Sequence, residues 1–216
     1  MAGFLLHLFL AMGLFAVSHV VLPILPLRSA LISVLGEQLY LAFYSILSIG
    51  LLAWVIMAYK AAPKVELFEP NTAMRHASLT LMLMSSFFTV AGIASRNPSL
   101  VPAEKLGWRP EAKGIFKITC HPLMWGIALW GFSHALANGH AAALALFGGM
   151  AALAVAGALH IDFRKRKTLG DTWLDFEKQT SFIPLAAIAA GRIRMEKGEI
   201  FWWQNVTSGR RLCRFA

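Results

Sequence analysis

The chain has 216 residues, of which 57% are hydrophobic and only 14% are charged. Charged residues make up about 25% of an ordinary soluble domain, so this composition indicates an integral membrane protein and argues against a soluble helical one. The net charge is +9, yet no basic stripe with interleaved aromatic residues is present, which argues against a nucleic-acid partner. In a membrane protein such an excess of Lys and Arg marks cytoplasmic loops.

Five apolar segments are long enough to cross a bilayer, which requires about 20 residues. We expect membrane-spanning helices over residues 3–22, 38–59, 74–94, 121–137 and 140–160. The fold class predicted is therefore an all-α, polytopic membrane bundle in contact with membrane lipid. The first span is expected to be retained, because it lacks the positive flank and the clear cleavage site of a signal peptide.

The connections between these spans differ in character. Pro23 and Pro26 break the chain after the first span, and a short helix-like stretch (SALISVLGEQ) follows. Residues 95–120 form the longest loop, punctuated by proline and glycine. Asn138-Gly139-His140 predicts a tight turn, so the fourth and fifth spans should form an antiparallel hairpin.

The distribution of Lys and Arg predicts the orientation of the bundle. Seventeen lie in the loops at 23–37 and 95–120 and after residue 160, against three on the opposite side. The rule that cytoplasmic loops are positive then places the N-terminus outside and the C-terminus in the cytoplasm. A basic run at 164–167 follows the last span, as expected at an anionic membrane surface. Trp202-Trp203 and Arg210-Arg211 in the tail indicate interfacial anchoring.

Several kinds of site are excluded by the residues present. Cys120 and Cys213 form no CxxC or CxxCH motif, so neither a zinc knuckle nor covalent c-type haem attachment is supported. Asp162 is the one acid near the membrane end of the last hairpin, which argues against paired-carboxylate and di-iron carboxylate chemistry. No GxGxxG or Walker motif occurs. Haem is the cofactor that best suits neutral imidazoles in an apolar helical bundle.

The chain has seven histidines within or at the edges of the expected spans: His7, His19, His76, His121, His134, His140 and His160. His121 and His134 lie about 20 Å apart along one helix, so they cannot bind the same iron. Depth in the membrane favours pairing His19 with His121, or His76 with His134.

His134 has the most suggestive neighbours in the sequence. Gly131 would leave room for a flat macrocycle beside it, and Trp130 could cover the edge of that macrocycle. Close helix packing through Gly131 is the structural alternative. We interpret His7, His140 and His160 as interfacial or solvated histidines.

Three stretches carry a family resemblance: SHVVLPILPLRSAL at 18–31, HPLMWGIALWGFSHALANG at 121–139, and DFRKRKTLGDTWLDFEKQTSFIPLAAIAAGR at 162–192. Together they resemble the NnrU family and divide the chain into an NnrU-like transmembrane domain at 1–194 and a basic, aromatic tail at 195–216. The resemblance implies a bacterial inner-membrane protein linked to nitrite and nitric oxide metabolism in denitrifiers. The family is related to plant 15-cis-zeta-carotene isomerase, in which haem b supports a redox-dependent double-bond isomerisation.

The resemblance also implies site residues. The two histidines proposed as haem ligands in the isomerase fall on His19 and His134, and His76 is the alternative partner of His134, with His121 a further candidate. The isomerase cysteine that exchanges with a ligand falls on Gly131, and another functional histidine falls near Lys60. Haem b and a lipophilic polyene substrate are therefore expected. No catalytic residue is assigned and the oligomeric state is left open.

A second resemblance supports an alternative function. His121-Pro122 and Gly126, with Trp173 further along the chain, are similar to the C-terminal half of isoprenylcysteine carboxyl methyltransferases. Those membrane enzymes bind S-adenosylmethionine through an RHPxYxG region, where this chain has Cys120 in place of the arginine. The alternatives are thus a methyltransferase dependent on S-adenosylmethionine, or a membrane accessory protein without enzymatic activity.

Overall fold

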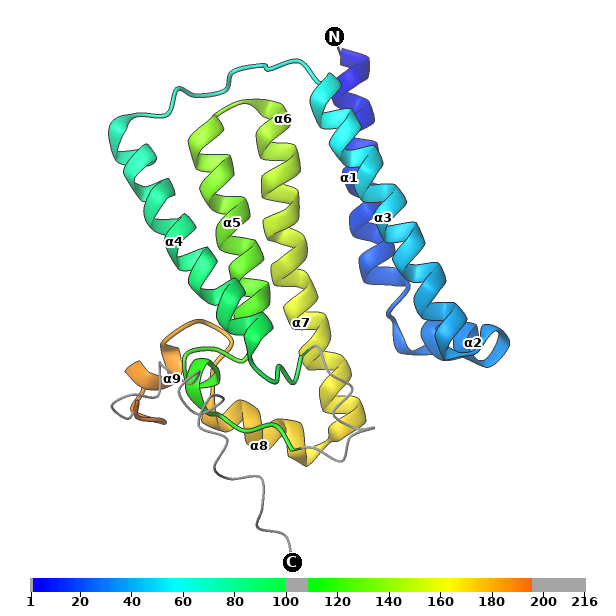
Figure 1. Ribbon diagram of the computed structural model, residues 1–216, viewed down its shortest axis with the longest axis vertical. Helices are drawn as coiled ribbons and strands as arrows, with labels where there is room; N and C mark the ends of the chain where they lie inside the picture. Colours follow the sequence, from blue (N-terminus) through cyan, green and yellow to red (C-terminus); the bar gives the residue numbers. More distant parts are fainter. Residues whose placement is uncertain (1, 100–108, 196–216) are drawn as a thin grey trace, which may run out of the picture. The chain divides into compact units, whose positions relative to one another are not determined.

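A computed structural model describes residues 2–99 and 109–195 of the chain (Figure 1). Within these ranges the chain forms helices, with one isolated antiparallel bridge between Glu66 and His140. This confirms the predicted all-α fold class. Nearly all of the tail at 195–216, including both tryptophans, its paired arginines and Cys213, lies outside the described residues. The boundary at 194 therefore stays a prediction.

The fold divides into two compact units. The first comprises the described residues of Met1–Val90 and Leu123–Arg164, and the second those of Ala91–Pro122 and Lys165–Ala216. The helices that lie largely in the first unit are α1 (Ala2–Val21), α2 (Leu25–Leu35), α3 (Glu37–Ala61), α4 (Thr72–Ala94), α5 (Pro122–Asn138), α6 (Ala141–Ala143), the π-helical turn η2 (Leu144–Gly148) and α7 (Gly149–Leu169).

The segment α1–α2–α3 folds back on itself through short connections. A proline at the first turn of α2 suits a helix start, because the backbone N–H that proline lacks would be unpaired there. Gly36 has φ +77°, a conformation that glycine adopts without strain, and it separates α2 from α3. The Tyr40 hydroxyl donates to the Leu22 carbonyl at 3.1 Å. The chain therefore reverses direction and packs α3 against α1, as Figure 1 shows.

The apolar core of the first unit joins α1 and α3 to the α5–α7 hairpin. Its buried residues are Leu8, Ala11, Met12, Phe15, Val55, Ala58, Ala62, Ala135, Ala142, Ala143, Leu146 and Phe147. Half of these are alanines, and small side chains let helix backbones approach closely within a membrane. Glycine does the same at position 149, where an added Cβ would lie 2.9 Å from Cγ of Met12.

The predicted hairpin between the fourth and fifth spans is present. Gly139 has φ +60°, and its carbonyl accepts hydrogen bonds from the backbone N–H groups of Leu67 (2.9 Å) and Phe68 (3.1 Å). A Cβ at Gly139 would lie 2.1 Å from the Phe68 carbonyl oxygen, so only glycine fits. His140 caps α6, because its Nδ1 accepts a hydrogen bond from the Ala143 N–H at 3.1 Å. This histidine is buried and has a structural role.

Hydrogen bonds join α4 to α5 across their interface. The hydroxyls of Ser78 and Ser133 each donate to the other residue's carbonyl at 2.8 Å, and the Ser85 hydroxyl donates to the Gly126 carbonyl at 2.7 Å. An added Cβ at Gly126 would lie 2.3 Å from Oγ1 of Thr89. Small residues and satisfied hydroxyls are therefore what hold these two helices together, at roughly 0.6–1.7 kcal/mol for each such hydrogen bond in a membrane.

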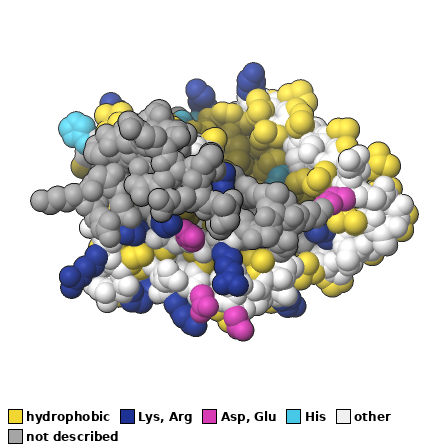
Figure 2. Space-filling model, turned by 60° about the horizontal axis from the view of Figure 1, so that its bottom comes forward, with side chains coloured by type: hydrophobic (Ala, Val, Ile, Leu, Met, Phe, Trp, Pro, Cys, Tyr) yellow, Lys and Arg dark blue, Asp and Glu magenta, His cyan; other side chains and the backbone are white. Residues whose placement is uncertain are grey.

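The described residues include four helices long and apolar enough to cross a membrane: Gly3–Val21, Glu37–Ala61, Thr72–Ala94 and Ala141–Leu169. The fourth predicted span forms the helix α5, which has 17 residues and is not among these four, so its crossing of the membrane stays a prediction. Many large hydrophobic side chains are exposed, including Phe4, Ile46 and Leu83, and Figure 2 shows such side chains across the visible surface. The protein is thus a multi-pass membrane protein whose apolar outer surface suits contact with lipid.

The second unit is built from two segments that are distant in the sequence. It contains η1 (Gly114–Lys117), α8 (Asp171–Gln179) and α9 (Ala186–Ala189). Trp173 and Phe176 are buried, and Phe176 contacts Phe116. The Cys120 N–H donates to the Ser181 carbonyl at 3.0 Å, and the Thr119 hydroxyl donates to the Phe182 carbonyl at 2.8 Å. These bonds hold the segment that leads into α5.

Candidate functional site

A mostly apolar pocket of about 380 Å³ lies within the first unit. Its lining comes from four helices and one connection: Phe15 and His19 of α1, Pro23, Tyr44 of α3, Met124 and Ile127 of α5, and Met150, Leu153, Ala154, Gly157, His160, Ile161 and Arg164 of α7. Small-molecule sites have volumes of roughly 300–1,000 Å³, apolar walls and a few polar groups. This pocket meets that description.

One face of α7 forms a wall of the pocket along the length of the helix from Met150 to Arg164. Its lining residues recur every three or four positions from Met150 to Arg164, which places them on one helix face. They span about 21 Å along the helix axis. The stripe is apolar from Met150 to Gly157 and then becomes polar at His160 and Arg164, so the two ends of the pocket differ in chemistry.

His19 lines the pocket with a defined tautomer. Its Nδ1 lies 2.8 Å from the Phe15 carbonyl oxygen, and a carbonyl can only accept, so Nδ1 carries the proton. In the neutral ring the lone pair is then on Nε2. The ring is half-buried against Phe15, with centroids 4.2 Å apart, and meets Tyr44 edge-on at 5.6 Å. Histidines that bind metals commonly donate their other N–H to a carbonyl in this way.

His160 is the second histidine of this pocket, although the sequence indicates only a solvated residue at a membrane edge. The structure places it on the pocket wall, half-buried, with Nε2 3.4 Å from the Pro23 carbonyl oxygen. This place on a pocket wall was not predicted. One sequence pattern could have indicated that His160 lines a pocket. The spacing of Gly157, His160 and Arg164 puts one small and two polar residues on one helix face.

His134 lies in a different environment. Its ring packs between Trp130 and Phe147, with centroid separations of 4.9 and 4.7 Å, and its Nδ1 donates to the Trp130 carbonyl at 3.0 Å. The expected contact with Trp130 is present. The space beside Gly131 is filled by a neighbouring helix, because a Cβ added there would lie 2.5 Å from the Phe147 carbonyl oxygen. His134 does not line the pocket.

The structure does not bring His19 and His134 together in this pocket. The α5 residues of the pocket, Met124 and Ile127, belong to the first two turns of that helix. His134 lies two further turns along, about 10 Å beyond Ile127 by helix rise. His134 therefore lies outside the stretch of α5 that lines the pocket.

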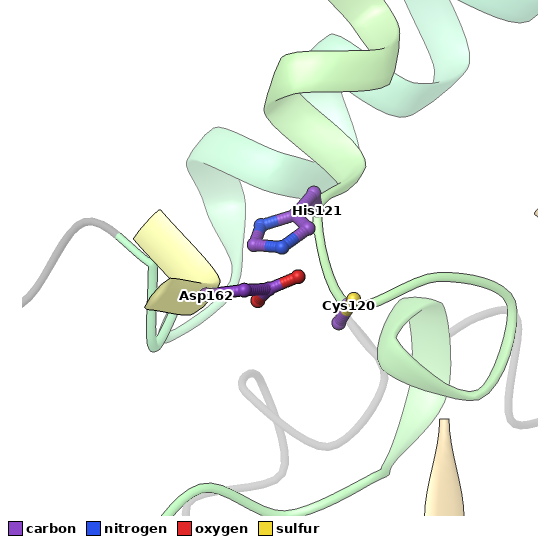
Figure 3. A group of neighbouring side chains, drawn as sticks. All are labelled: Cys120, His121 and Asp162. Atoms are coloured by element: carbon purple, nitrogen blue, oxygen red, sulfur yellow. The ribbon is translucent and has the colours of Figure 1, made fainter. Parts of the chain in front are cut away.

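The other two candidate ligands, His76 and His121, are not among the residues that line the pocket. His76 is exposed on the first turns of α4. His121 is fully buried in the second unit, where its Nδ1 lies 3.0 Å from Oγ of Ser99 and its ring meets Phe182 edge-on at 5.7 Å. Figure 3 shows His121 and Cys120 where the chain enters α5. His7 is exposed on α1, in agreement with an interfacial residue.

The residues that resemble a methyltransferase also have structural roles. Gly126 allows the close approach of α4, and the buried Trp173 packs against Phe176 at a centroid distance of 5.2 Å. Gly170, with φ +52°, separates α7 from α8. These three residues therefore serve helix packing and a chain turn in this fold.

Curated relatives match part of the chain. It is 36% identical over 84 residues to "15-cis-zeta-carotene isomerase, chloroplastic" of Zea mays, which covers 39% of this chain and 23% of the isomerase. It is 39% identical over 79 residues to the protein of the same name from Arabidopsis thaliana, which covers 37% of this chain and 22% of that protein. The matched stretch thus spans less than a quarter of either relative.

No solved structure matches the chain. The model of the family described as NnrU protein matches residues 7–203, which include both histidines of the expected ligand pair and every residue that lines the pocket. Since this match covers nearly the whole sequence, the chain belongs to the NnrU family.

Proposed function

We propose that this NnrU family protein binds haem b in the α1/α3/α5/α7 pocket, with Nε2 of His19 as an iron ligand. The observation that carries the proposal is the His19 tautomer: Nδ1 is hydrogen bonded to the Phe15 carbonyl, while the ring faces a mostly apolar pocket. A neutral imidazole nitrogen in such a setting is the ordinary protein ligand of haem iron.

The pocket fits this cofactor in three respects. Its walls are largely aliphatic and aromatic, which favours burial of a porphyrin. Its donor set contains two imidazoles, His19 and His160, beside one phenol, Tyr44. The Phe15 carbonyl orients the His19 ring, as second-sphere groups do for histidines that bind metals.

From the family pattern we propose His134 as the second ligand. His76 is the alternative to His19 as the partner of His134. His134 has a tautomer that suits iron, because its Nδ1 donates to the Trp130 carbonyl. It would have to leave the contacts with Trp130 and Phe147, or α1 and α5 would have to shift, for His19 and His134 to reach one iron. His19 alone therefore has the stronger support.

The activity proposed is cis–trans isomerisation of a lipophilic polyene, controlled by the redox state of the haem. Support comes from the two plant relatives, whose name is that of a zeta-carotene isomerase. Haem b supplies an iron centre whose charge and ligation change with its redox state. The protein's contribution is to orient His19 and to provide an apolar pocket wall along α7. A role in nitrite or nitric oxide metabolism without turnover is the alternative within the same family.

The proposed location is the bacterial inner membrane, with the N-terminus outside and the C-terminus in the cytoplasm. The support is the distribution of seventeen Lys and Arg against three between the two sides.

Purification in detergent from cells supplied with haem tests the cofactor and the activity together. We expect a stoichiometric haem, measured as a Soret band that shifts on reduction, and conversion of a cis polyene that depends on the redox state. Absence of the Soret band would refute haem binding. Haem without conversion would favour the nitric-oxide-related role, and binding of S-adenosylmethionine in calorimetry without haem would favour the methyltransferase alternative.

A further inference from the structure

The backbone carbonyl of Phe15 accepts hydrogen bonds from several donors at once. Its oxygen lies 2.8 Å from Nδ1 of His19, and the hydroxyl of Ser18 donates to the same oxygen, also at 2.8 Å. The α-helical backbone directs the N–H of His19 to this oxygen as well. A carbonyl oxygen has two lone pairs, so three donors share two acceptor positions.

The Ser18 hydroxyl therefore competes with the His19 ring for one acceptor. The two side chains are neighbours in the sequence, and Oγ of Ser18 lies 3.4 Å from Nδ1 of His19. A donor that engages a lone pair leaves less of it for the other donors. The hydrogen bond from Nδ1 is thus weaker than it would be if His19 were the one side-chain donor to this carbonyl.

The strength of the Nδ1 hydrogen bond sets how electron-rich the His19 ring is. A stronger bond raises the basicity of the other ring nitrogen as a metal ligand. Hydrogen bonding around the ligands is one of the means by which a protein sets the reduction potential of a bound haem. A more electron-rich imidazole stabilises ferric over ferrous iron, because the ferric ion carries the higher positive charge.

Ser18 itself is half-buried and does not line the pocket, whereas His19 does. An effect of its hydroxyl on the cofactor would therefore pass through the Phe15 carbonyl and the His19 ring. Hydrogen bonds from serine to the carbonyl three residues earlier are common in helices, and Ser33 of α2 makes one at 2.7 Å. Ser18 differs because its acceptor also orients a pocket histidine.

We propose that Ser18 is a positioning residue that raises the reduction potential of haem bound by His19. Its hydroxyl engages part of the Phe15 carbonyl and so keeps the His19 imidazole a moderate electron donor. The inference rests on the proposed function, because it concerns the iron ligand proposed there. It adds a control over the redox state on which the proposed isomerisation depends.

The test measures the reduction potential of the full-length protein loaded with haem, followed by the Soret band at a series of applied potentials. Ser18→Thr and Ser18→Val are nearly identical in shape, but only threonine keeps a hydroxyl. Ser18→Ala removes the hydroxyl without adding bulk. Ser33→Ala is the matched control, since it removes the same kind of hydrogen bond from a helix whose residues do not line the pocket.

We expect Ser18→Ala and Ser18→Val to lower the ratio of reduced to oxidised haem at a fixed potential. The factor should be at most about ten, the scale of one hydrogen bond. A tenfold change corresponds to about 59 mV for a one-electron couple. Ser18→Thr and Ser33→Ala should keep the wild-type potential.

Two results would overturn the inference while leaving haem binding intact. One is an unchanged or raised potential in both variants that lack the hydroxyl. The other is an equal fall in Ser18→Thr and Ser18→Val, since added bulk would then be responsible. If wild-type protein binds no haem, or if His19→Ala keeps the wild-type spectrum and potential, the proposed function fails and the inference fails with it.

Discussion

His19 and His134 share one local geometry and lie in two contrasting places. Each donates through Nδ1 to the carbonyl four residues earlier in its helix, at 2.8 Å for His19 and 3.0 Å for His134. In the neutral form of each ring the lone pair is then on Nε2. This shared geometry comes from the helix alone.

Their surroundings differ in the space available. His19 faces a pocket of about 380 Å³, whereas His134 packs between Trp130 and Phe147 beside a glycine that has no room for a methyl group. The comparison teaches that a tautomer suited to metal binding is a local property, while access for a cofactor depends on how distant helices pack.

The largest effect is expected from filling the pocket at Gly157. An added Cβ there meets only Met124 Sδ, at 3.9 Å, so the backbone has room for a side chain. Gly157→Leu should keep the fold and lower haem affinity by about 100-fold, because forcing extra methylenes into a filled site costs up to about 3 kcal/mol. Soret titration measures the affinity and thermal unfolding checks the fold. Undiminished haem binding would place the cofactor elsewhere.

A smaller effect on stability is expected from Gly131→Ala beside His134. Its Cβ would lie 2.5 Å from a backbone carbonyl oxygen, which cannot move aside cheaply. The variant should lose about 1–3 kcal/mol of unfolding free energy. Gly50→Ala is the matched control, since an added Cβ at that α3 position meets nothing within 4 Å. Equal stability of the two variants would mean that the space around His134 is larger than the structure shows.

The smallest effect is expected at the α4–α5 interface near His134. Ser133→Ala removes a hydroxyl that donates to the Ser78 carbonyl at 2.8 Å. We expect a loss of about 1 kcal/mol in detergent unfolding, the usual scale for hydrogen bonds between membrane helices. A double-mutant cycle with Ser78→Ala measures the coupling between the two hydroxyls, whose oxygens lie 2.9 Å apart, and strictly additive losses would contradict a contact between them.

Properties that depend on short stretches could be predicted from the sequence. The spans at 3–22, 38–59 and 74–94 match α1, α3 and α4 to within two residues at each end, because their apolar lengths and flanking breaks are explicit. The Asn138-Gly139-His140 turn was equally explicit, since a glycine with positive φ is a local requirement.

The pocket could not be predicted in the same way. Its lining combines His19, Tyr44, Ile127 and His160 from four helices, and single-sequence patterns do not give their relative rotation. The place of His160 on the pocket wall was not predicted for this reason. The helix of the fifth predicted span, α7, also continues beyond residue 160 to Leu169 through the basic run at 164–167. This extension brings Arg164 onto the face that lines the pocket.

Haem binding through His19 is tested most directly by paired alanine variants on one helix. His19→Ala and His7→Ala both remove an imidazole from α1, but only His19 lines the pocket. Absorption spectra of the purified proteins, normalised to protein concentration, should show the Soret band lost or shifted in His19→Ala and unchanged in His7→Ala. A Soret band of wild-type position and intensity in His19→Ala would contradict the account.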